Sequence, residues 1–367
     1  MRKIAVFGAS KNGLRIKNEL LAIGESVLFF CDNDPKKQGE KLDGIEIVSY
    51  TQTVQLVKKK CIDTIVISLI KPDEIVDQIR NSGVMVELFG VSRGYLINEG
   101  NCIGAISSFL YPIEYSKPRL EYFEYHVAFH CNLKCKGCGH YSNIAKPEFG
   151  NLNVYKNDIK RLKELYWGVE RIRLMGGEPL LNKQLSQFIV ATRNTFPDAN
   201  IRVVTNGLLI PDINENLLKI MHEYNTGFDV TQYPPTQEVK EKIELRCLEH
   251  GVEMAMSPLV KEFFDNWNSN TENSQQISYE RCISKGCHYL EDGKMSLCCA
   301  PILQLKLQDI LKREVEVSEN DIIDIYKDTL DGFLLNKYLS KPIKFCKYCD
   351  NENIKWFPWE GNYPYLN

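Results

Sequence analysis

The sequence has no long hydrophobic run and almost no excess charge of either sign. None of its 367 residues belong to an apolar stretch long enough to cross a bilayer. The net charge of −3 gives no electrostatic footprint for nucleic acid or an acidic membrane. The segment Met1–Gly8 lacks the apolar core and the small-residue cleavage site of a signal peptide. These absences favour a cytoplasmic protein with no membrane and no nucleic-acid partner.

Cysteine, by contrast, is plentiful. The chain has 13 cysteines, and in a reducing compartment clustered cysteines indicate metal or redox chemistry more often than disulfides. Cys31, Cys61, Cys102 and Cys247 stand apart from the others and are interpreted as small apolar residues. The others fall into two groups, one around residue 135 and one between residues 282 and 349.

Residues 1–95 alternate short apolar runs with helical segments. Ile4–Phe7, Ser26–Phe30 and Thr64–Ser68 are predicted strands, and predicted helices separate them. Strands that alternate with helices are typical of a parallel sheet with helices on both faces. We therefore expect a small α/β domain with a Rossmann-like parallel sheet.

The first turn of this domain approximates a dinucleotide-binding fingerprint. Gly8 and Gly13 occupy its outer positions, Ser10 replaces the middle glycine, and Asp32 ends the second strand. The stretch Phe30–Ile45 resembles the N-terminal domain of bacterial sugar N-acyltransferases, which binds the nucleotide part of a sugar nucleotide. The resemblance implies nucleotide or sugar-nucleotide binding, with Gly8, Gly13 and Asp32 as candidate residues. A non-binding scaffold and NAD(P) binding are the alternatives.

A second α/β domain is predicted over residues 121–265. Residues 96–120 have little periodicity and are interpreted as a linker. Beyond them five predicted strands alternate with helices, too few for a closed eight-stranded barrel. We expect a partial TIM-type barrel of the (β/α)6 kind. In such barrels functional groups gather at the C-terminal ends of the strands.

Three motifs follow the first three strands of this barrel. Cys131, Cys135 and Cys138 have the spacing C-x3-C-x2-C, Leu174–Leu181 contains a Gly-Gly-Glu-Pro sequence, and Val204–Gly207 reads Val-Thr-Asn-Gly. Three adjacent thiols can hold three irons of a four-iron cluster and leave the fourth without a protein ligand. Together the motifs resemble those of radical S-adenosylmethionine (SAM) enzymes.

The resemblance implies a [4Fe–4S] cluster on the three cysteines, with SAM chelating the open iron. Reductive cleavage of SAM then gives a 5′-deoxyadenosyl radical that abstracts hydrogen from a substrate. Gly176 and Gly177 are expected to let the backbone approach SAM. Glu178 is expected to pair with the SAM ammonium group, and Asn206 to hydrogen-bond its ribose or carboxylate.

One position departs from the family pattern. The residue before the third cysteine is commonly aromatic and lies near adenine, but here it is Gly137. His140 and Tyr141 are the nearby candidates for that contact. The alternative to an iron–sulfur cluster is a zinc site with His140 as the fourth ligand.

The second cysteine group resembles the twitch subdomain, a short form of the SPASM extension of radical SAM enzymes. Its residues imply one auxiliary [4Fe–4S] cluster held by Cys282, Cys298, Cys346 and Cys349 in a small cysteine-rich subdomain, residues 266–367. Asp292-Gly293 is a hairpin signal that would fold Cys298 back beside Cys282. Cys287 is the alternative to Cys282 as a ligand, and a zinc ribbon is the alternative to the cluster. The aromatic stretch Trp356–Glu360 is predicted to pack against the barrel.

These observations predict a radical SAM oxidoreductase that acts on a small molecule. The single auxiliary cluster resembles that of the twitch-type dehydrogenase of aminocyclitol antibiotic synthesis, and the motifs also resemble radical SAM proteins of bacterial surface-carbohydrate synthesis. We expect dehydrogenation or epimerisation of a sugar, polyol or sugar nucleotide, with a flavodoxin- or ferredoxin-type reductant. In an epimerase, Cys287 or Cys299 would donate the hydrogen atom. The alternatives are a maturase of ribosomally made peptides and a non-enzymatic scaffold.

Overall fold

The structure is a computed structural model that describes residues 2–98, 104–268 and 273–361. The chain forms two compact units: unit 1 is Met1–Arg119 with Tyr166–Gly168 and Phe196–Ala199, and unit 2 is the remainder. Among the described residues, no helix combines the length and the apolar character that a membrane span requires. Cys102 lies outside the described residues. Of the other isolated cysteines, Cys31 and Cys247 are buried as expected, whereas Cys61 is exposed.

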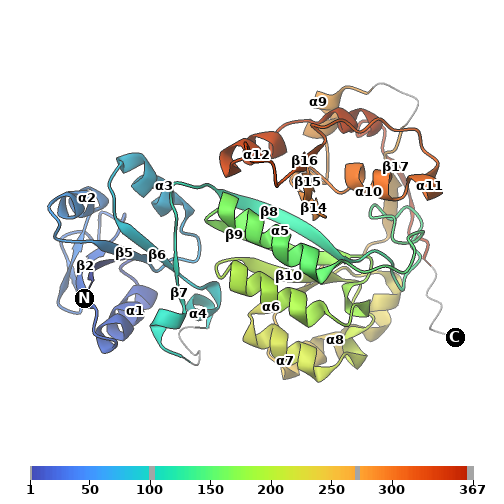
Figure 1. The fold of residues 1–367 in the computed structure, drawn as a ribbon. Helices are drawn as coiled ribbons and strands as arrows, with labels where there is room; N and C mark the ends of the chain where they lie inside the picture. Colours follow the sequence, from blue (N-terminus) through green and yellow to red (C-terminus); the bar gives the residue numbers. More distant parts are fainter. Residues whose placement is uncertain (1, 99–103, 269–272, 362–367) are drawn as a thin grey trace. The chain divides into compact units, whose positions relative to one another are not determined.

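Unit 1 contains one seven-stranded sheet in the order β3-β4-β2-β1-β5-β6-β7 (Figure 1). The strands are β1 (Lys3–Phe7), β2 (Ser26–Cys31), β3 (Lys41–Leu42), β4 (Ile45–Val48), β5 (Thr64–Ile67), β6 (Glu87–Val91) and β7 (Leu110–Pro112). The helices are α1 (Lys11–Ala22), α2 (Tyr50–Lys58), α3 (Asp73–Ser82) and α4 (Arg93–Ile97), with a 3-10 turn η1 (Ile106–Ser108). The pairs β4–β2, β2–β1, β1–β5 and β5–β6 are parallel, which confirms the expected parallel sheet.

Both faces of this sheet are buried. Ala5 and Phe7 of β1 belong to one hydrophobic cluster, while Ile4 and Val6 belong to another. Because successive side chains of a strand point to opposite faces, the two clusters lie on the two sides of the sheet. This explains why β1 is apolar at four consecutive positions, Ile4–Phe7, rather than at every second one.

The structure places a strand inside the segment expected to be a linker. Leu110–Pro112 forms β7, which pairs antiparallel with β6 at one edge of the sheet. A Cβ at Gly90 of β6 would overlap the ring of Tyr111, so β7 packs closely on its neighbour. A three-residue strand that ends in proline carries too little alternation to be recognised in the sequence, and proline is tolerated at such an edge.

Unit 2 contains an eight-stranded sheet in the order β12-β11-β10-β9-β8-β14-β15-β16. Its strands are β8 (Arg119–Ala128), β9 (Gly168–Gly176), β10 (Asn200–Thr205), β11 (Thr226–Val230), β12 (Met254–Met256), β14 (Tyr289–Glu291), β15 (Lys294–Ser296) and β16 (Ile322–Asp324). The pairs β12–β11, β11–β10, β10–β9 and β8–β14 are parallel, and β14–β15 and β15–β16 are antiparallel. The sheet has two open ends, as expected for a partial barrel, and its sixth parallel position is taken by β14 from the C-terminal part of the chain.

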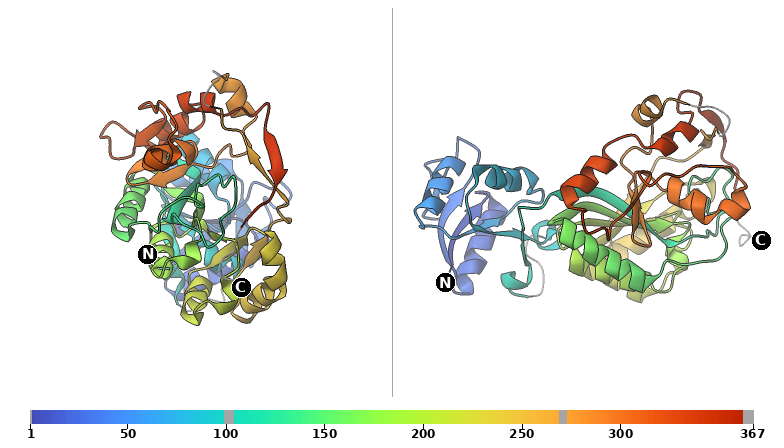
Figure 2. Two further views of the ribbon diagram at one scale, coloured as in Figure 1. Left: turned by 90° about the vertical axis from the view of Figure 1, so that its right-hand side faces the viewer. Right: turned by 45° about the horizontal axis from the view of Figure 1, so that its top comes forward.

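Helices cover one side of this sheet and a smaller layer completes the unit. The views in Figures 1 and 2 show the helices that alternate with β8–β12 lying side by side along the sheet. They are α5 (Leu152–Leu165), α6 (Leu185–Thr195), α7 (Glu215–Glu223) and α8 (Pro234–Glu249), with the 3-10 turns η2 (Pro179–Leu181) and η3 (Ile210–Asp212). The C-terminal layer adds β13 (Glu262–Asp265), α9 (Gln275–Glu280), α10 (Ala300–Lys306), α11 (Gln308–Leu311), α12 (Gly332–Leu339), η4 (Lys344–Tyr348) and β17 (Lys355–Pro358).

The two faces of β8 have different neighbours. Tyr125 packs against Tyr155 of α5, with ring centroids 4.5 Å apart, and so faces the helices. By strand alternation Glu124 and His126 lie on the opposite face, where the ring of His126 meets Tyr289 of β14 at 4.7 Å. Glu124 and His126 are therefore directed away from the helices.

The predicted hairpin at residues 292–293 is confirmed. Asp292 and Gly293 join β14 to β15 and both have positive φ, 48° and 72°, as a two-residue type I′ turn requires. Asp158 of α5 accepts hydrogen bonds from the Gly293 N–H at 2.9 Å and from the Tyr326 hydroxyl at 2.8 Å. The buried carboxylate of Asp158 thereby fastens the hairpin to the barrel.

Replacing Asp158 with alanine should destabilise unit 2. The buried Gly293 N–H would lose its acceptor, which typically costs about 1–3 kcal/mol for an unsatisfied buried group, and the exposed Tyr326 would lose its contact with the helix. Denaturant unfolding followed by circular dichroism should therefore give a lower free energy of unfolding for D158A. Lys160→Ala, an exposed site on the same helix, is the matched control and should change little. Equal stabilities of the two variants would contradict this account of the hairpin.

Candidate functional site

The loops that follow β8, β9 and β10 meet around one cavity. The cavity has a volume of about 140 Å³. The predicted site residues that line it are Cys131, Cys135, Cys138, His140, Gly176, Gly177 and Asn206. Ser142, Thr205, Tyr233 and Phe263 complete its polar and aromatic wall. Residues from three separate motifs thus share one cavity, whereas Glu178 is not among the lining residues.

The glycine pair is required by the packing of two strand ends. Gly177 N–H donates to the carbonyl oxygen of Ala128 at 2.8 Å, and Glu178 N–H donates to that of His130 at 3.0 Å. A Cβ at Gly176 would overlap the Ala128 carbonyl oxygen, and one at Gly177 would overlap the His130 carbonyl group. The glycines therefore bring the end of β9 against the segment that leads into the cysteine loop. Their close approach to SAM itself stays a prediction.

Glu178 is completely buried and joins two of the loops. Its carboxylate accepts hydrogen bonds from Leu180 N at 3.1 Å, Thr205 Oγ1 at 2.7 Å and Asn206 N at 3.0 Å. Burial raises the pKa of Glu178 to about 7, although these three donors act in the opposite direction. Because Glu178 is fully buried and does not line the cavity, these bonds hold the loops together, and its contact with the SAM ammonium stays a prediction.

Asn206 extends the network to the first cysteine. Its Nδ2 lies 2.7 Å from Asn132 Oδ1 and 3.6 Å from Cys131 Sγ. Its backbone carbonyl accepts from the Thr236 hydroxyl of α8 at 2.8 Å. Asn132 was not predicted from the sequence, because an asparagine between two cysteine positions carries no signal of its own. Its role is visible only in the folded chain, where the loop after β10 meets the loop after β8.

The chemistry of the thiols fits an iron–sulfur cluster. Burial raises the pKa of Cys131 to about 12, with Glu178 as the next largest influence, and burial likewise raises the pKa of Cys135 to about 11. These thiols would keep their protons unless a positive centre compensated the thiolates. A cluster of iron ions supplies that charge, and coordinated thiols are deprotonated. In the zinc alternative His140 would bind the metal through Nε2, because its Nδ1 is 3.0 Å from His126 Nε2.

The second cysteine group also converges. The thiols of Cys298, Cys346 and Cys349 each interact electrostatically with Cys282, and burial is the largest cause of the raised pKa in all of them. Cys287 instead interacts with Glu124 and Arg173 as well as with Cys282. This arrangement favours Cys282 over Cys287 as the fourth member of the group. All of the described cysteines are free, so no disulfide competes for these thiols.

A cluster of polar side chains lies beside both cysteine groups. Glu124 of β8 interacts electrostatically with Arg173 of β9, Cys287 and Cys299, and Cys287 also interacts with Arg173 and Cys299. The thiol of Cys299 also interacts with Cys138 of the first group and with its neighbour Cys298 of the second. Burial raises the pKa of Glu124 to about 7, against the lowering effect of Tyr122 and Arg173. Neither Glu124 nor Arg173 was predicted as a site residue, because neither belongs to a recognisable motif.

Glu124 of this cluster and two nearby histidines could hold a metal ion. One ligand atom each from Glu124, His126 and His140 lie within 4.8 Å of one another. The Nδ1 atom of His126 is buried without a hydrogen-bond partner. However, Lys306 lies close enough to lower the pKa of His126, and Arg173 acts on Glu124. Because Lys306 and Arg173 already supply positive charge near these residues, a polar or hydroxylated ligand fits them better than a metal cation does.

In unit 1 the structure brings Gly8 and Asp32 to the same turn. Gly8 has φ 109°, and a Cβ at Gly13 would overlap the Gly8 carbonyl oxygen. The Asp32 carboxylate accepts from Ala9 N at 2.9 Å and from Lys37 Nζ at 2.9 Å. Burial alone would raise the pKa of Asp32, but these donors and the Asp34 N–H lower it. Asp32 thus shapes the turn, and nucleotide binding by these residues stays a prediction.

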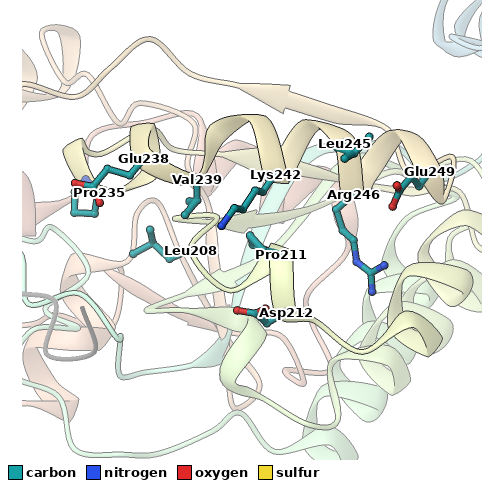
Figure 3. A pocket seen from close by; sticks show the side chains of 10 residues that line it. All are labelled: Leu208, Pro211, Asp212, Pro235, Glu238, Val239, Lys242, Leu245, Arg246 and Glu249. Carbon is teal, nitrogen blue, oxygen red and sulfur yellow. The ribbon is translucent and has the colours of Figure 1, made fainter. Parts of the chain in front are cut away.

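A larger groove lies away from the cysteines. It has a volume of about 430 Å³ and runs between α8 and η3 (Figure 3). Figure 3 shows Lys242 and Arg246 pointing from α8 into it, and Asp212 on its other side. It contains none of the predicted site residues. Size alone therefore does not identify the chemical site of this chain.

Replacing Glu178 with glutamine should remove part of the pH dependence of stability. The raised pKa means that the folded chain binds the Glu178 proton more tightly than the unfolded chain. The free energy of unfolding should therefore fall as pH rises from about 4.5 to about 7, by about 3 kcal/mol from this group. In E178Q this share should be absent in denaturant titrations of the metal-free chain at several pH values. The exposed Glu223→Gln is the control; identical pH profiles for wild type and E178Q would rule out the assignment.

Comparison with known proteins gives two family matches and several relatives. The radical SAM superfamily matches residues 125–249, and the family described as C2185-like, N-terminal matches residues 1–87. A GTP 3′,8-cyclase of Clostridium botulinum is 33% identical over 255 residues, which cover 64% of this chain and 78% of that protein. Among solved structures, BtrN in complex with AdoMet and 2-DOIA has 20% identity and a TM-score of 0.39, covering 64% of this chain and 94% of BtrN.

Another solved structure resembles a smaller part of the chain. UDP-D-quinovosamine 4-dehydrogenase from Vibrio fischeri has 26% identity and a TM-score of 0.26, and covers 31% of this chain and 93% of that one. The decisive comparison is the sequence relative, because a third of its aligned residues are shared over most of its length. From this relationship and the superfamily match across the cysteine loop, we conclude that the chain belongs to the radical SAM superfamily.

Proposed function

We propose that this radical SAM enzyme abstracts hydrogen from a small hydroxylated molecule and dehydrogenates it. The substrate class that fits best is a sugar, a polyol or a sugar nucleotide. The observation that carries the proposal is the cluster of Glu124, Arg173, Cys287 and Cys299. The Cys287 thiol interacts with Cys282, and the Cys299 thiol interacts with Cys138 and Cys298, so the cluster adjoins both metal-binding groups. A buried carboxyl group and a guanidinium are suited to bind hydroxyl or phosphate groups.

The chain's residues have distinct roles in this proposal. Cys131, Cys135 and Cys138 hold the catalytic cluster, and Cys282, Cys298, Cys346 and Cys349 hold an auxiliary one. When bound, SAM and the first cluster supply a 5′-deoxyadenosyl radical that removes a carbon-bound hydrogen, and the auxiliary cluster supplies an acceptor for the second electron. Glu124 accepts the hydroxyl proton, a task suited to a carboxyl group whose pKa is near 7.

A second candidate reaction is epimerisation. It is favoured by Cys299, whose pKa burial raises well above that of an ordinary thiol, so that it stays protonated as a hydrogen-atom donor. After hydrogen abstraction, an S–H group on the other side of the substrate carbon would give its hydrogen atom to the carbon radical with inverted stereochemistry. The thiyl radical left on sulfur would return to the thiol by taking one electron from the flavodoxin- or ferredoxin-type reductant and one proton from solvent. The two reactions differ in outcome, because only epimerisation introduces solvent hydrogen into the product.

Two other substrate classes are alternatives to a carbohydrate. The relatives named GTP 3′,8-cyclase make a nucleotide a candidate substrate, and a ribosomally made peptide is the further alternative. The glycine turn of unit 1, with Gly8, Gly13 and Asp32, supports a nucleotide-bearing substrate over a peptide. We also propose a flavodoxin- or ferredoxin-type protein as the reductant in the cytoplasm.

Substitution of single cysteines should separate the two clusters. Cys135→Ala should abolish SAM cleavage and retain the iron of the auxiliary group, because only the first site loses a ligand. Cys349→Ala should lower the iron content and leave some uncoupled cleavage. Iron analysis and 5′-deoxyadenosine release from anaerobically reconstituted protein measure both. The isolated Cys247→Ala is the control. Continued 5′-deoxyadenosine formation by C135A would overturn the assignment of the catalytic cluster.

Glu124→Gln should uncouple SAM cleavage from substrate oxidation. Loss of a general base typically costs 10²–10⁴-fold, so ketone formation should fall about 100-fold while 5′-deoxyadenosine release persists. Because the pKa of Glu124 is raised to about 7, the wild-type oxidation rate should rise as pH increases through this value, and E124Q should lack the rise. The titratable or charged groups near Glu124 are Tyr122, His126, His140, Arg173, Cys287, Tyr289 and Cys299. Glu121→Gln, exposed on the same strand, is the control.

The assay uses a panel of UDP- and GDP-sugars, with GTP and a synthetic peptide as competing substrates. Formation of a ketone in step with 5′-deoxyadenosine supports dehydrogenation. Deuterium from D2O in an inverted product, lost in Cys299→Ser, establishes epimerisation instead. Consumption of GTP or peptide alone would refute the carbohydrate substrate class.

A further inference from the structure

A segment near the C-terminus lies directly on the first cysteine loop. The strand β17 pairs antiparallel with β13, and Trp359 N–H continues the ladder by donating to Lys261 O at 2.8 Å. Beyond it, Glu360 accepts the Lys136 N–H at 2.8 Å, and its carboxylate lies 3.2 Å from Lys136 Nζ. Lys136 stands between the second and third cysteines of the loop. We call residues 355–360 the clasp.

The clasp has a shape complementary to the loop. Gly137 has φ 73°, and a Cβ there would overlap the ring of Phe357. The Lys136 ammonium lies 5.6 Å from the centre of the same ring. A residue with a side chain at position 137 would therefore displace Phe357, and with it the clasp, from where it lies in this structure. The glycine that departs from the family pattern is therefore matched by an aromatic ring from the clasp.

Trp359 makes the polar contact of the clasp. Its indole Nε1 lies 3.3 Å from Sγ of Cys135, which is only 6% exposed. The indole is held in place by Tyr233, stacked with a centroid distance of 5.9 Å, and Tyr233 in turn stacks on Phe263. An indole N–H can only donate, and a neutral thiol is a weak acceptor, whereas a thiolate is a strong one. The contact is suited to a metal-bound sulfur.

We propose that Trp359 is a positioning residue that raises the reduction potential of the catalytic cluster by donating a hydrogen bond to Cys135. The inference rests on the proposed role of Cys131, Cys135 and Cys138 as its ligands. Reduction adds one negative charge, and part of that charge resides on the sulfur atoms. A donor at a sulfur therefore stabilises the reduced state more than the oxidised state, and hydrogen bonds to cluster sulfurs are known to set potentials.

The test is Trp359→Phe in the reconstituted holoenzyme. The substitution keeps an aromatic ring for Tyr233 but removes the N–H. The equilibrium constant for one-electron reduction of the catalytic cluster should fall about tenfold, which corresponds to about 59 mV. A redox titration followed by electron paramagnetic resonance measures this, and the signal that changes when SAM is added identifies the catalytic cluster.

Trp356→Phe is the matched control. Trp356 lies in the same strand, is 56% exposed and packs on Phe264 rather than on the cysteine loop. Its replacement should leave the potential unchanged. An unchanged potential in W359F, with a SAM-responsive signal present, overturns the proposal. Absence of a SAM-responsive signal in the wild type would overturn the proposed function as well, so the two failures are distinguishable.

A second variant covers the case in which W359F loses its cluster. Phe357→Ala leaves the indole in place but removes the ring that packs on Gly137. If residues 355–360 clasp the loop, a chelator should remove the iron of the catalytic site several-fold faster from F357A than from wild type or W356F. Equal rates in all three proteins contradict the clasp.

Discussion

The whole site depends on two backbone hydrogen bonds between neighbouring strand ends. Gly177 and Glu178 donate to the carbonyl oxygens of Ala128 and His130 at 2.8 and 3.0 Å, in a space that admits no Cβ at Gly176 or Gly177. This contact fixes where the cysteine loop leaves β8 relative to the loop after β9. Any residue larger than glycine would separate the strand ends, and the cavity between the loops would not form.

From that contact, a single chain of hydrogen bonds reaches the first cysteine. Glu178 accepts from Thr205 and Asn206, and Asn206 donates to Asn132 close to Cys131 Sγ. The network is buried, so each of its polar groups would cost free energy if its partner were lost. The three loops therefore behave as one rigid unit, and a metal cluster can be held by three ligands without support from a fourth.

The sequence was sufficient for the elements with strong local patterns. The cysteine spacing, the glycine pair and the Asp292-Gly293 hairpin follow from a few adjacent residues, and the structure brings each of them where it was expected. Glu124 and Arg173 could not be found in this way, because a polar residue in an apolar strand gains meaning only from its neighbours across the sheet. The contact of Trp359 with Cys135 spans 224 positions, and no local periodicity reports such a pairing. For β7 the limit was its length of three residues.

The aromatic stretch near the C-terminus was expected to pack against the barrel, and its actual course joins the two cysteine groups. The backbone of Cys349 forms an isolated antiparallel β-bridge with that of Trp267, and Asp350 N–H donates to Asn266 O at 2.7 Å. Further along the chain β17 pairs with β13, and Trp359 then contacts Cys135. The segment from Cys349 to Trp359 thus pairs with residues 261–267 at both of its ends, with a shift of register between the isolated bridge and β17. It has a ligand candidate of the auxiliary group at one end and a hydrogen-bond donor to the catalytic group at the other. Because both ends are paired to the same neighbouring segment, this stretch of chain supports both cysteine groups.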